Sequence, residues 1–179
     1  MKNIILVANN DEAKHIKDLE SDNCKIIITG EGRSNVITTI ARQIKDRHIT
    51  DDDMIINVGY VGSPRLYKGE IVCINKVQPF IPSLSIIEPS MDLVTDKITS
   101  LKFTQCYTSD NFVNKEDYEN NNITDFNSVC DMELYWITLM LNNVLSIKIV
   151  SDNCDYDDYT QADFKESWET VRNKLKEIL

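Results

Sequence analysis

The chain has 179 residues, of which 42% are hydrophobic and 27% charged, a composition typical of one globular domain over residues 1–179. Its 29 acidic and 19 basic residues give a formal net charge of −10, which excludes nucleic acid as a main partner because a phosphate backbone would be repelled. No apolar stretch approaches the roughly 20 residues of a membrane span, and the five cysteines form no C-x-x-C pair. We therefore expect a cytoplasmic protein with reduced thiols, no membrane partner and no zinc site.

Short runs rich in Ile and Val predict buried strands that alternate with helices. The predicted strands cover residues 3–8, 25–29, 54–58, 71–77 and 146–150, and the predicted helices cover 34–45, 132–141 and 164–179. Ser34 is a candidate cap of the first helix. This alternation indicates an α/β fold with a mixed, mostly parallel central sheet flanked by helices.

Two segments fit neither the strand nor the helix period. Gln78–Ser100 contains Pro79, Pro82 and Pro89, and we expect it to cross the surface or contact a neighbouring subunit. The acidic, Asn-rich stretch around 120–122 predicts a mobile loop.

Polar residues that could act on a sugar and a base gather near the ends of the strands. These are Glu12, the glycine loop Asn57–Ser63, the pair Asp110 and Phe112, and the pair Ser151 and Asp152. Parallel sheets bind ligands beyond the carboxyl ends of their strands. Glycosyl transfer needs one group to stabilise or activate a nucleophile and another to protonate the leaving group. Two carboxylates in different environments suffice, and Glu12 and Asp152 are the candidate pair.

Five segments carry a resemblance to a known family: Asn57–Ser63, Lys68–Val72, Ser109–Phe112, Val129–Glu133 and Lys148–Asp152. In order and spacing they resemble the 5′-methylthioadenosine and S-adenosylhomocysteine nucleosidases, a branch of the nucleoside phosphorylase superfamily. The glycine loop alone is a weak signal, whereas Asp-Met-Glu opening a helix, followed by Ser-Asp at a strand end, is more specific.

The resemblance implies a three-layer nucleoside phosphorylase-like fold, trimmed because this chain is short and has one strand, 25–29, where the family has several. It implies a homodimeric N-glycosidase of methionine salvage that needs no cofactor and no metal. The substrate would be a small-molecule purine nucleoside of the adenosine type, such as 5′-methylthioadenosine or S-adenosylhomocysteine.

The resemblance also implies roles for the carboxylates at the strand ends. Glu12 resembles the acid/base that activates the attacking water, although by itself it is an acid in a helix's first turn, where the macrodipole favours it. Asp152 is similar to the aspartate that donates a proton toward N7 of the purine, oriented by Ser151, and by itself it would be a capping residue. The proton donor would need a raised pKa and a low-dielectric pocket.

Substrate-binding residues follow from the same resemblance. Glu133 is similar to the acceptor of hydrogen bonds from the ribose hydroxyls, with Met132 packing against the sugar. Its alternative is a solvated acid at a helix start. Phe112 is similar to the residue that stacks on the purine, and the backbone of Val113 to the one that meets the base edge.

The chain departs from the family at three places. Asp131 replaces the first glutamate of Glu-Met-Glu. Beside Gly59 in the glycine loop, Tyr60 stands where the family has a small residue, and it would narrow the pocket or change the substrate. The abbreviated segment Gln78–Pro89 resembles the region that covers the 5′ end of the nucleoside.

Three other functions stay open. A phosphorylase would need an anion site, and Arg33, at a helix start beside Glu31, is the one candidate for it. A non-catalytic nucleoside-binding module would keep the fold with a reduced pocket. A receiver-like regulatory domain would need an acceptor Asp after a central strand, which 54–59 lacks. His15 and His48 have no ligand-spaced partners and are expected at the surface.

Overall fold

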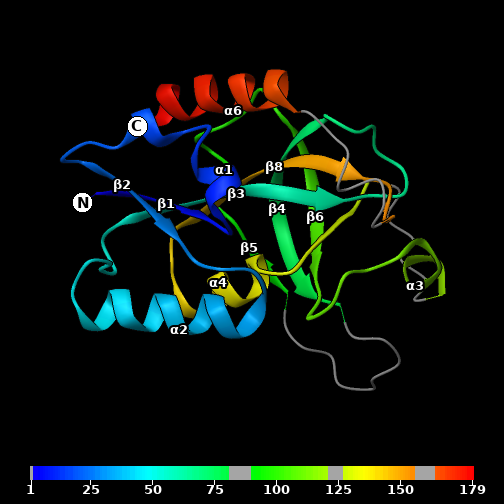
Figure 1. The fold of residues 1–179 in the computed structure, drawn as a ribbon, viewed down its shortest axis with the longest axis horizontal. Coiled ribbons are helices and arrows are strands. Elements are labelled where there is room, and N and C mark those ends of the chain that lie inside the picture. The colour runs from blue at the N-terminus through cyan, green and yellow to red at the C-terminus, as the bar shows by residue number, and fades with distance from the viewer. Residues whose placement is uncertain (1, 81–89, 121–126, 156–163) are drawn as a thin grey trace.

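The computed structural model describes residues 2–80, 90–120, 127–155 and 164–179 (Figure 1). Its strands are β1 (Asn3–Val7), β2 (Cys24–Ile28), β3 (Met54–Gly62), β4 (Ile71–Pro79), β5 (Met91–Asp92), β6 (Lys102–Thr108), β7 (Val129–Asp131) and β8 (Val144–Asp152). Its helices are α1 (Asn10–Ala13), α2 (Gly32–Lys45), α3 (Lys115–Asn120), α4 (Leu134–Met140) and α6 (Lys165–Ile178). A short 3-10 turn, Lys17–Leu19, follows α1.

The strands form one mixed sheet that closes on itself at one end. β2, β1, β3 and β8 pair in parallel, in line with the apolar runs that predicted them. β8 also pairs antiparallel with β4. β4 pairs in parallel with β6, and β6 in parallel with β7. β7 then pairs antiparallel with the end of β3. The strands β3, β8, β4, β6 and β7 therefore form a closed ring, and β1 and β2 extend it on one side.

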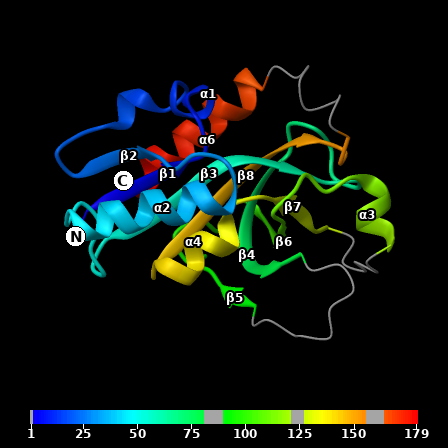
Figure 2. The same cartoon turned by 60° about the horizontal axis from the view of Figure 1, so that its bottom comes forward.

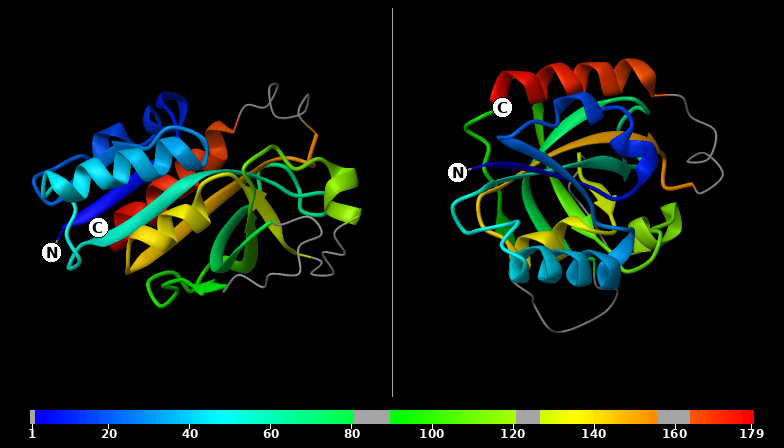
Figure 3. Two further views of the ribbon diagram at one scale, coloured as in Figure 1. Left: turned by 90° about the horizontal axis from the view of Figure 1, so that it is seen from below. Right: turned by 60° about the vertical axis from the view of Figure 1, so that its left-hand side comes forward.

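Helices cover both faces of the sheet. α6 lies along one face, and α2 and α4 lie side by side on the other (Figures 2 and 3). Alternate residues of β1 point to the two faces, so Ile4 and Leu6 pack in the α2 and α4 layer, whereas Ile5 and Val7 pack in the α6 layer. The amphipathic pattern of residues 164–179 is satisfied by burial of Trp168 against this second layer.

The α/β class and the mixed sheet are confirmed, and several local predictions are corrected. The glycine loop 57–63 is mostly strand, because β3 continues to Gly62 by pairing with β8 through a bulge after Val61. The segment 78–100 is partly sheet, since β4 extends to Pro79 and β5 pairs with it. Residues 81–89 and the predicted loop at 121–122 lie outside the described residues.

The start of α2 and the position of one histidine also differ from the prediction. The first residue of α2 is Gly32 and its N-cap is Glu31, so Ser34 lies inside the first turn and does not cap it. His15 is half-buried because its ring stacks on Trp168 with centroids 4.9 Å apart, whereas His48 is exposed as expected. All five cysteines carry free, buried thiols. Within the described ranges, no helix is both long and apolar enough to span a bilayer.

Candidate active site

One cavity of about 320 Å³ opens where the carboxyl ends of four strands meet. Residues after β1 and at the ends of β3, β7 and β8 line it, and β7 contributes because it approaches β3 antiparallel, with Cys130 paired to Gly62. The described lining residues are Ala8, Asn9, Glu12, Glu31, Tyr60, Val61, Gly62, Phe112, Cys130, Asp131, Met132, Glu133, Ser151 and Asp152. Glu12, Glu133 and Asp152, which lie far apart in the sequence, are thus brought to one cavity together with Phe112.

Glu12 belongs to the first turn of α1, but its carboxylate is buried and does not point into solvent. Oε2 accepts a hydrogen bond from the backbone N–H of Ala8 at 2.7 Å, and Oε1 accepts one from Tyr60 at 3.1 Å. Burial raises the pKa of Glu12 above its usual value, and the nearby Lys148 ammonium and the backbone donors oppose that rise. A buried carboxyl group with a raised pKa is suited to accept a proton.

Gly59 lies beneath Glu12 and is not part of the cavity wall. A Cβ atom at this position would stand 2.7 Å from Glu12 Oε1, closer than real Cβ contacts allow. A side chain at this position would therefore displace the Glu12 carboxylate from its backbone donors, a constraint that the sequence could not reveal.

Asp152 ends β8 and is buried. Ser151 donates its hydroxyl to Oδ2 at 2.7 Å, and the backbone N–H of Cys154 donates to Oδ1 at 2.8 Å. The Ser151 hydroxyl thus holds one oxygen of the Asp152 carboxyl group, and the backbone holds the other. Gly62 also lies close to this carboxyl group, because a Cβ atom at position 62 would stand 2.8 Å from Asp152 Oδ1.

Glu133 is buried at the start of α4 and is not solvated. Its Oε1 accepts the backbone N–H of Gly32, the first residue of α2, at 2.8 Å. Burial raises the pKa of Glu133 to about 7, the charge of Asp131 adds to the rise, and Lys148 opposes it. A carboxyl group held at the positive end of α2 can accept hydrogen bonds from a ligand hydroxyl.

Lys148 is the residue that sequence reasoning missed. Its ammonium pairs with Asp131 Oδ2 at 3.0 Å, and both side chains are almost completely buried. Burial lowers the pKa of Lys148, but Asp131 and Glu133 more than offset this, so the net shift is upward. A lysine between Ile147 and Ile149 in an apolar strand was the available signal, because such a residue needs a buried partner.

The remaining predicted residues divide between the cavity and its surroundings. Phe112 and Met132 line the cavity, whereas Val113 lines a smaller hollow beside it. Tyr60 also lines the cavity, and its hydroxyl accepts a hydrogen bond from Trp168 Nε1 at 2.6 Å, which holds the ring toward α6.

Arg33 does not face the cavity. Its guanidinium lies 3.4 Å from Asp110 and 4.3 Å from the centroid of the Trp136 ring. This candidate for an anion site is thus engaged elsewhere. In the described ranges, no cluster of three or more His, Cys, Asp or Glu residues is arranged to hold a metal ion.

No protein-family model matches the sequence, and a search of curated proteins finds no match. Solved structures do match. The 5′-methylthioadenosine/S-adenosylhomocysteine nucleosidase of Helicobacter pylori, with butyl-thio-DADMe-Immucillin-A, superposes with a TM-score of 0.81 at 16% identity, over 99% of this chain and 97% of that chain.

The chain has the nucleosidase fold. Futalosine hydrolase of H. pylori gives a TM-score of 0.80 at 17% identity, over 99% of this chain and 97% of that chain. S-adenosylhomocysteine nucleosidase of Streptococcus pyogenes gives a TM-score of 0.79 at 15% identity, over 99% of this chain and 95% of that chain. These matches span nearly the whole of both chains. The structure describes every residue between β1 and β3, and β2 is the one strand in this interval, as the sequence predicted.

Proposed function

We propose that this chain hydrolyses the N-glycosidic bond of an adenosine-type purine nucleoside. The observation that carries the proposal is the convergence of Glu12, Glu133 and Asp152 around one cavity, with Phe112 in its wall. The names of the similar structures, nucleosidases and a hydrolase, agree with this reaction. Glycoside cleavage requires one group to activate the nucleophile and another to protonate the leaving group, and two carboxyl groups in different surroundings supply both.

In the proposed reaction, a water molecule attacks C1′ of the ribose as the bond from C1′ to N9 breaks. Glu12 takes a proton from the water, and its raised pKa suits that task. Asp152 gives a proton to N7, so that the electrons of the broken bond leave with a neutral base. Glu133 accepts hydrogen bonds from the ribose hydroxyls, Met132 packs against the sugar, and Phe112 stacks on the purine.

Water is favoured over phosphate as the nucleophile by the charges of the cavity. Five of the described lining residues are acids and none is basic. A phosphate ion would need cationic or backbone donors near C1′, and the guanidinium of Arg33 is held by Asp110. Phosphorolysis is the second candidate, and a nucleoside-binding module without activity is the third.

The test is incubation of the purified protein with a panel of purine nucleosides, with and without phosphate. We expect free base and free ribose in both conditions. Formation of ribose 1-phosphate only when phosphate is present would identify a phosphorylase. Binding of nucleosides without release of base would identify a binding module, and neither binding nor release would refute the proposal.

The assembly proposed is a cytoplasmic homodimer, on the support of the sequence resemblance and the free thiols. Sedimentation equilibrium of the full chain would test the dimer, and a mass near that of one 20.6 kDa chain would contradict it.

A further inference from the structure

Two polar residues of the cavity lining, Asn9 and Glu31, are bonded to each other. Asn9 follows β1 and caps α1, whereas Glu31 follows β2 and caps α2. The Asn9 side-chain amide donates to Glu31 Oε1 at 2.9 Å, which joins the loop after β1 to the loop after β2. Both residues line the cavity, and Glu31 is solvent-exposed.

The carboxylate of Glu31 is not used to stabilise its own helix. An acidic residue at an N-cap usually accepts a backbone N–H of the first turn, but Glu31 makes no such bond. The N–H of Gly32 is donated to Glu133 instead. Among the described residues, only the Asn9 amide bonds the Glu31 carboxylate, so its second oxygen is available to a ligand.

The charge of the cavity limits which substituents can bind beside Asn9 and Glu31. Besides Glu31, the lining acids are Glu12, Asp131, Glu133 and Asp152, and no basic side chain is among the described lining residues. The segments 81–89, 121–126 and 156–163 contain no Lys, Arg or His, so they bring no positive side chain. Lys148 is paired with Asp131. An anionic substituent would therefore be repelled.

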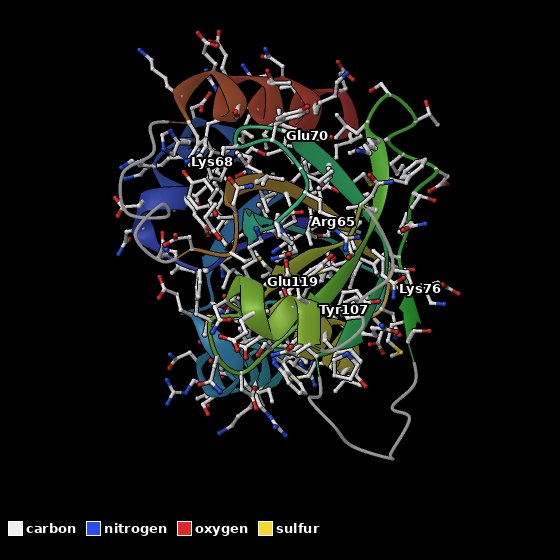
Figure 4. All side chains as sticks on the ribbon, turned by 90° about the vertical axis from the view of Figure 1, so that its right-hand side faces the viewer. Arg65, Lys68, Glu70, Lys76, Tyr107 and Glu119 are labelled. Carbon is white, nitrogen blue, oxygen red and sulfur yellow. The ribbon has the colours of Figure 1, made fainter. Side chains whose placement is uncertain are left out.

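Three basic residues at the end of the molecule that carries α3 lie on the β3–β4 side of the fold and outside the cavity lining. Figure 4 labels Arg65 and Lys68, from the connection between β3 and β4, and Lys76 of β4. These three residues are not among the described lining residues of the cavity. The same view labels Glu119, an exposed acid of α3 that is likewise not among them.

Hydrogen bonds connect the loops that carry this pair to the carboxylates assigned to the sugar. Asn9 Oδ1 accepts the backbone N–H of Glu12 at 3.0 Å, and Glu31 precedes Gly32, which is bonded to Glu133. The pair is thus attached to the two carboxylates assigned to the sugar and its attacking water. Asp152, assigned to the base, is instead bonded by Ser151 and Cys154. If the base lies at Asp152 and the ribose hydroxyls bond to Glu133, the substituent at C5′ is the part of the nucleoside that is left to meet Asn9 and Glu31.

We propose that Asn9 and Glu31 select a nucleoside whose 5′ substituent is a hydrogen-bond donor or a cation, in preference to a thioether. This rests on the proposed function, because the direction of the substrate comes from the roles assigned to Asp152 and Glu133. A hydroxyl or an ammonium group donates to the available carboxylate oxygen. A thioether gives that oxygen no donor and displaces the water that would otherwise bond it.

The experiment measures kcat/KM for adenosine, 5′-amino-5′-deoxyadenosine and 5′-methylthioadenosine with the native chain, Glu31→Leu and Glu31→Gln. The native protein should prefer the amino and hydroxyl compounds. Glu31→Leu should reduce the ratio of amino to methylthio turnover by about tenfold, the lower range for a hydrogen bond to a charged group at an exposed site. Glu31→Gln, which keeps an acceptor oxygen, should reduce it less. Glu119→Leu removes one exposed acid outside the cavity and should leave the ratio unchanged.

Two results would overturn the inference while the proposed function stands: a native preference for 5′-methylthioadenosine, or a ratio that Glu31→Leu does not change. If the native chain hydrolyses none of the three compounds, the proposed function is wrong. Calorimetric binding of the same three compounds to the native chain and Glu31→Leu then still decides whether Glu31 selects the 5′ group, and absence of binding would refute the selection too.

Discussion

The Nζ atom of Lys148 lies 3.0 Å from Oδ2 of Asp131, with 2% and 0% of the two side chains exposed. The pair acts on the pKa of Glu133. Burial raises this pKa, the charge of Asp131 raises it further, and the charge of Lys148 lowers it. Asp131 also accepts the hydroxyl of Thr108 and the backbone N–H of Leu134, so this carboxylate joins β6, β8 and α4. Removing one charge alone would leave the other buried without its partner.

Lys148→Met should lower the free energy of unfolding by roughly 3–5 kcal/mol, because it leaves Asp131 as an uncompensated buried charge. The double variant Asp131→Asn with Lys148→Met should recover part of that loss. Urea denaturation followed by tryptophan fluorescence measures both. A single variant with the native urea midpoint would show that the pair contributes nothing.

Gly59→Ala should reduce nucleoside hydrolysis by about 100-fold, because the added Cβ displaces the Glu12 carboxylate from the position its backbone donors define. The loss is expected mainly in kcat. A double-mutant cycle with Glu12→Gln provides the control, since adding Gly59→Ala to that variant should cost little further activity. If the double variant lost activity by the product of the two single losses, Gly59→Ala would not act through the Glu12 carboxylate.

Asp152→Asn keeps the size and hydrogen-bonding capacity of the side chain but removes the titrating proton. If Asp152 protonates the leaving base, kcat should fall by about 100- to 10,000-fold while nucleoside affinity is retained. Release of free base and calorimetric binding measure the two effects. An undiminished kcat would mean that the proton comes from another group.

The stability of the protein should depend on pH through Glu133, whose pKa is raised from 4.5 to about 7. A carboxyl group with a higher pKa in the folded state binds more protons when folded, so the free energy of unfolding decreases as pH rises through that range. Glu133→Gln should flatten this decrease. Denaturation at pH 5 and pH 8 of both proteins provides the comparison, and equal slopes would contradict the assignment.

The sequence predicted those parts of the fold whose residues are uniformly apolar or regularly amphipathic. β1, β3 and β8 follow from runs of Ile and Val, and α6 from its helical pattern. β6 was missed because its buried residues include Thr104 and Thr108, whose hydroxyls are satisfied by Asn127 and Asp131 across the sheet. β4, β6 and β7 run opposite to β3 and β8. The direction of a strand depends on how the chain connects it to its neighbours, and the local hydrophobic period does not predict those connections.

The site was predicted less evenly. Carboxylates near strand ends, such as Glu12 and Asp152, were found because the ends of parallel strands meet at one edge. The start of α2 was misjudged because the group that bonds its first N–H is Glu133, about 100 residues away in the sequence. Glu31 was considered only as an obstacle to an anion, since its bond to Asn9 is a tertiary contact.

The two carboxylates of the proposed reaction differ in how their supporting elements open. Each strand of the closed ring is hydrogen-bonded on both sides. β8 cannot separate without breaking two ladders, and β3 cannot separate without breaking three. Amide hydrogen exchange in β8 should therefore require global unfolding, whereas α1, with four residues, should exchange through local fraying. Glu12 is thus carried by an element that can open alone, and Asp152 by the part of the chain that opens last.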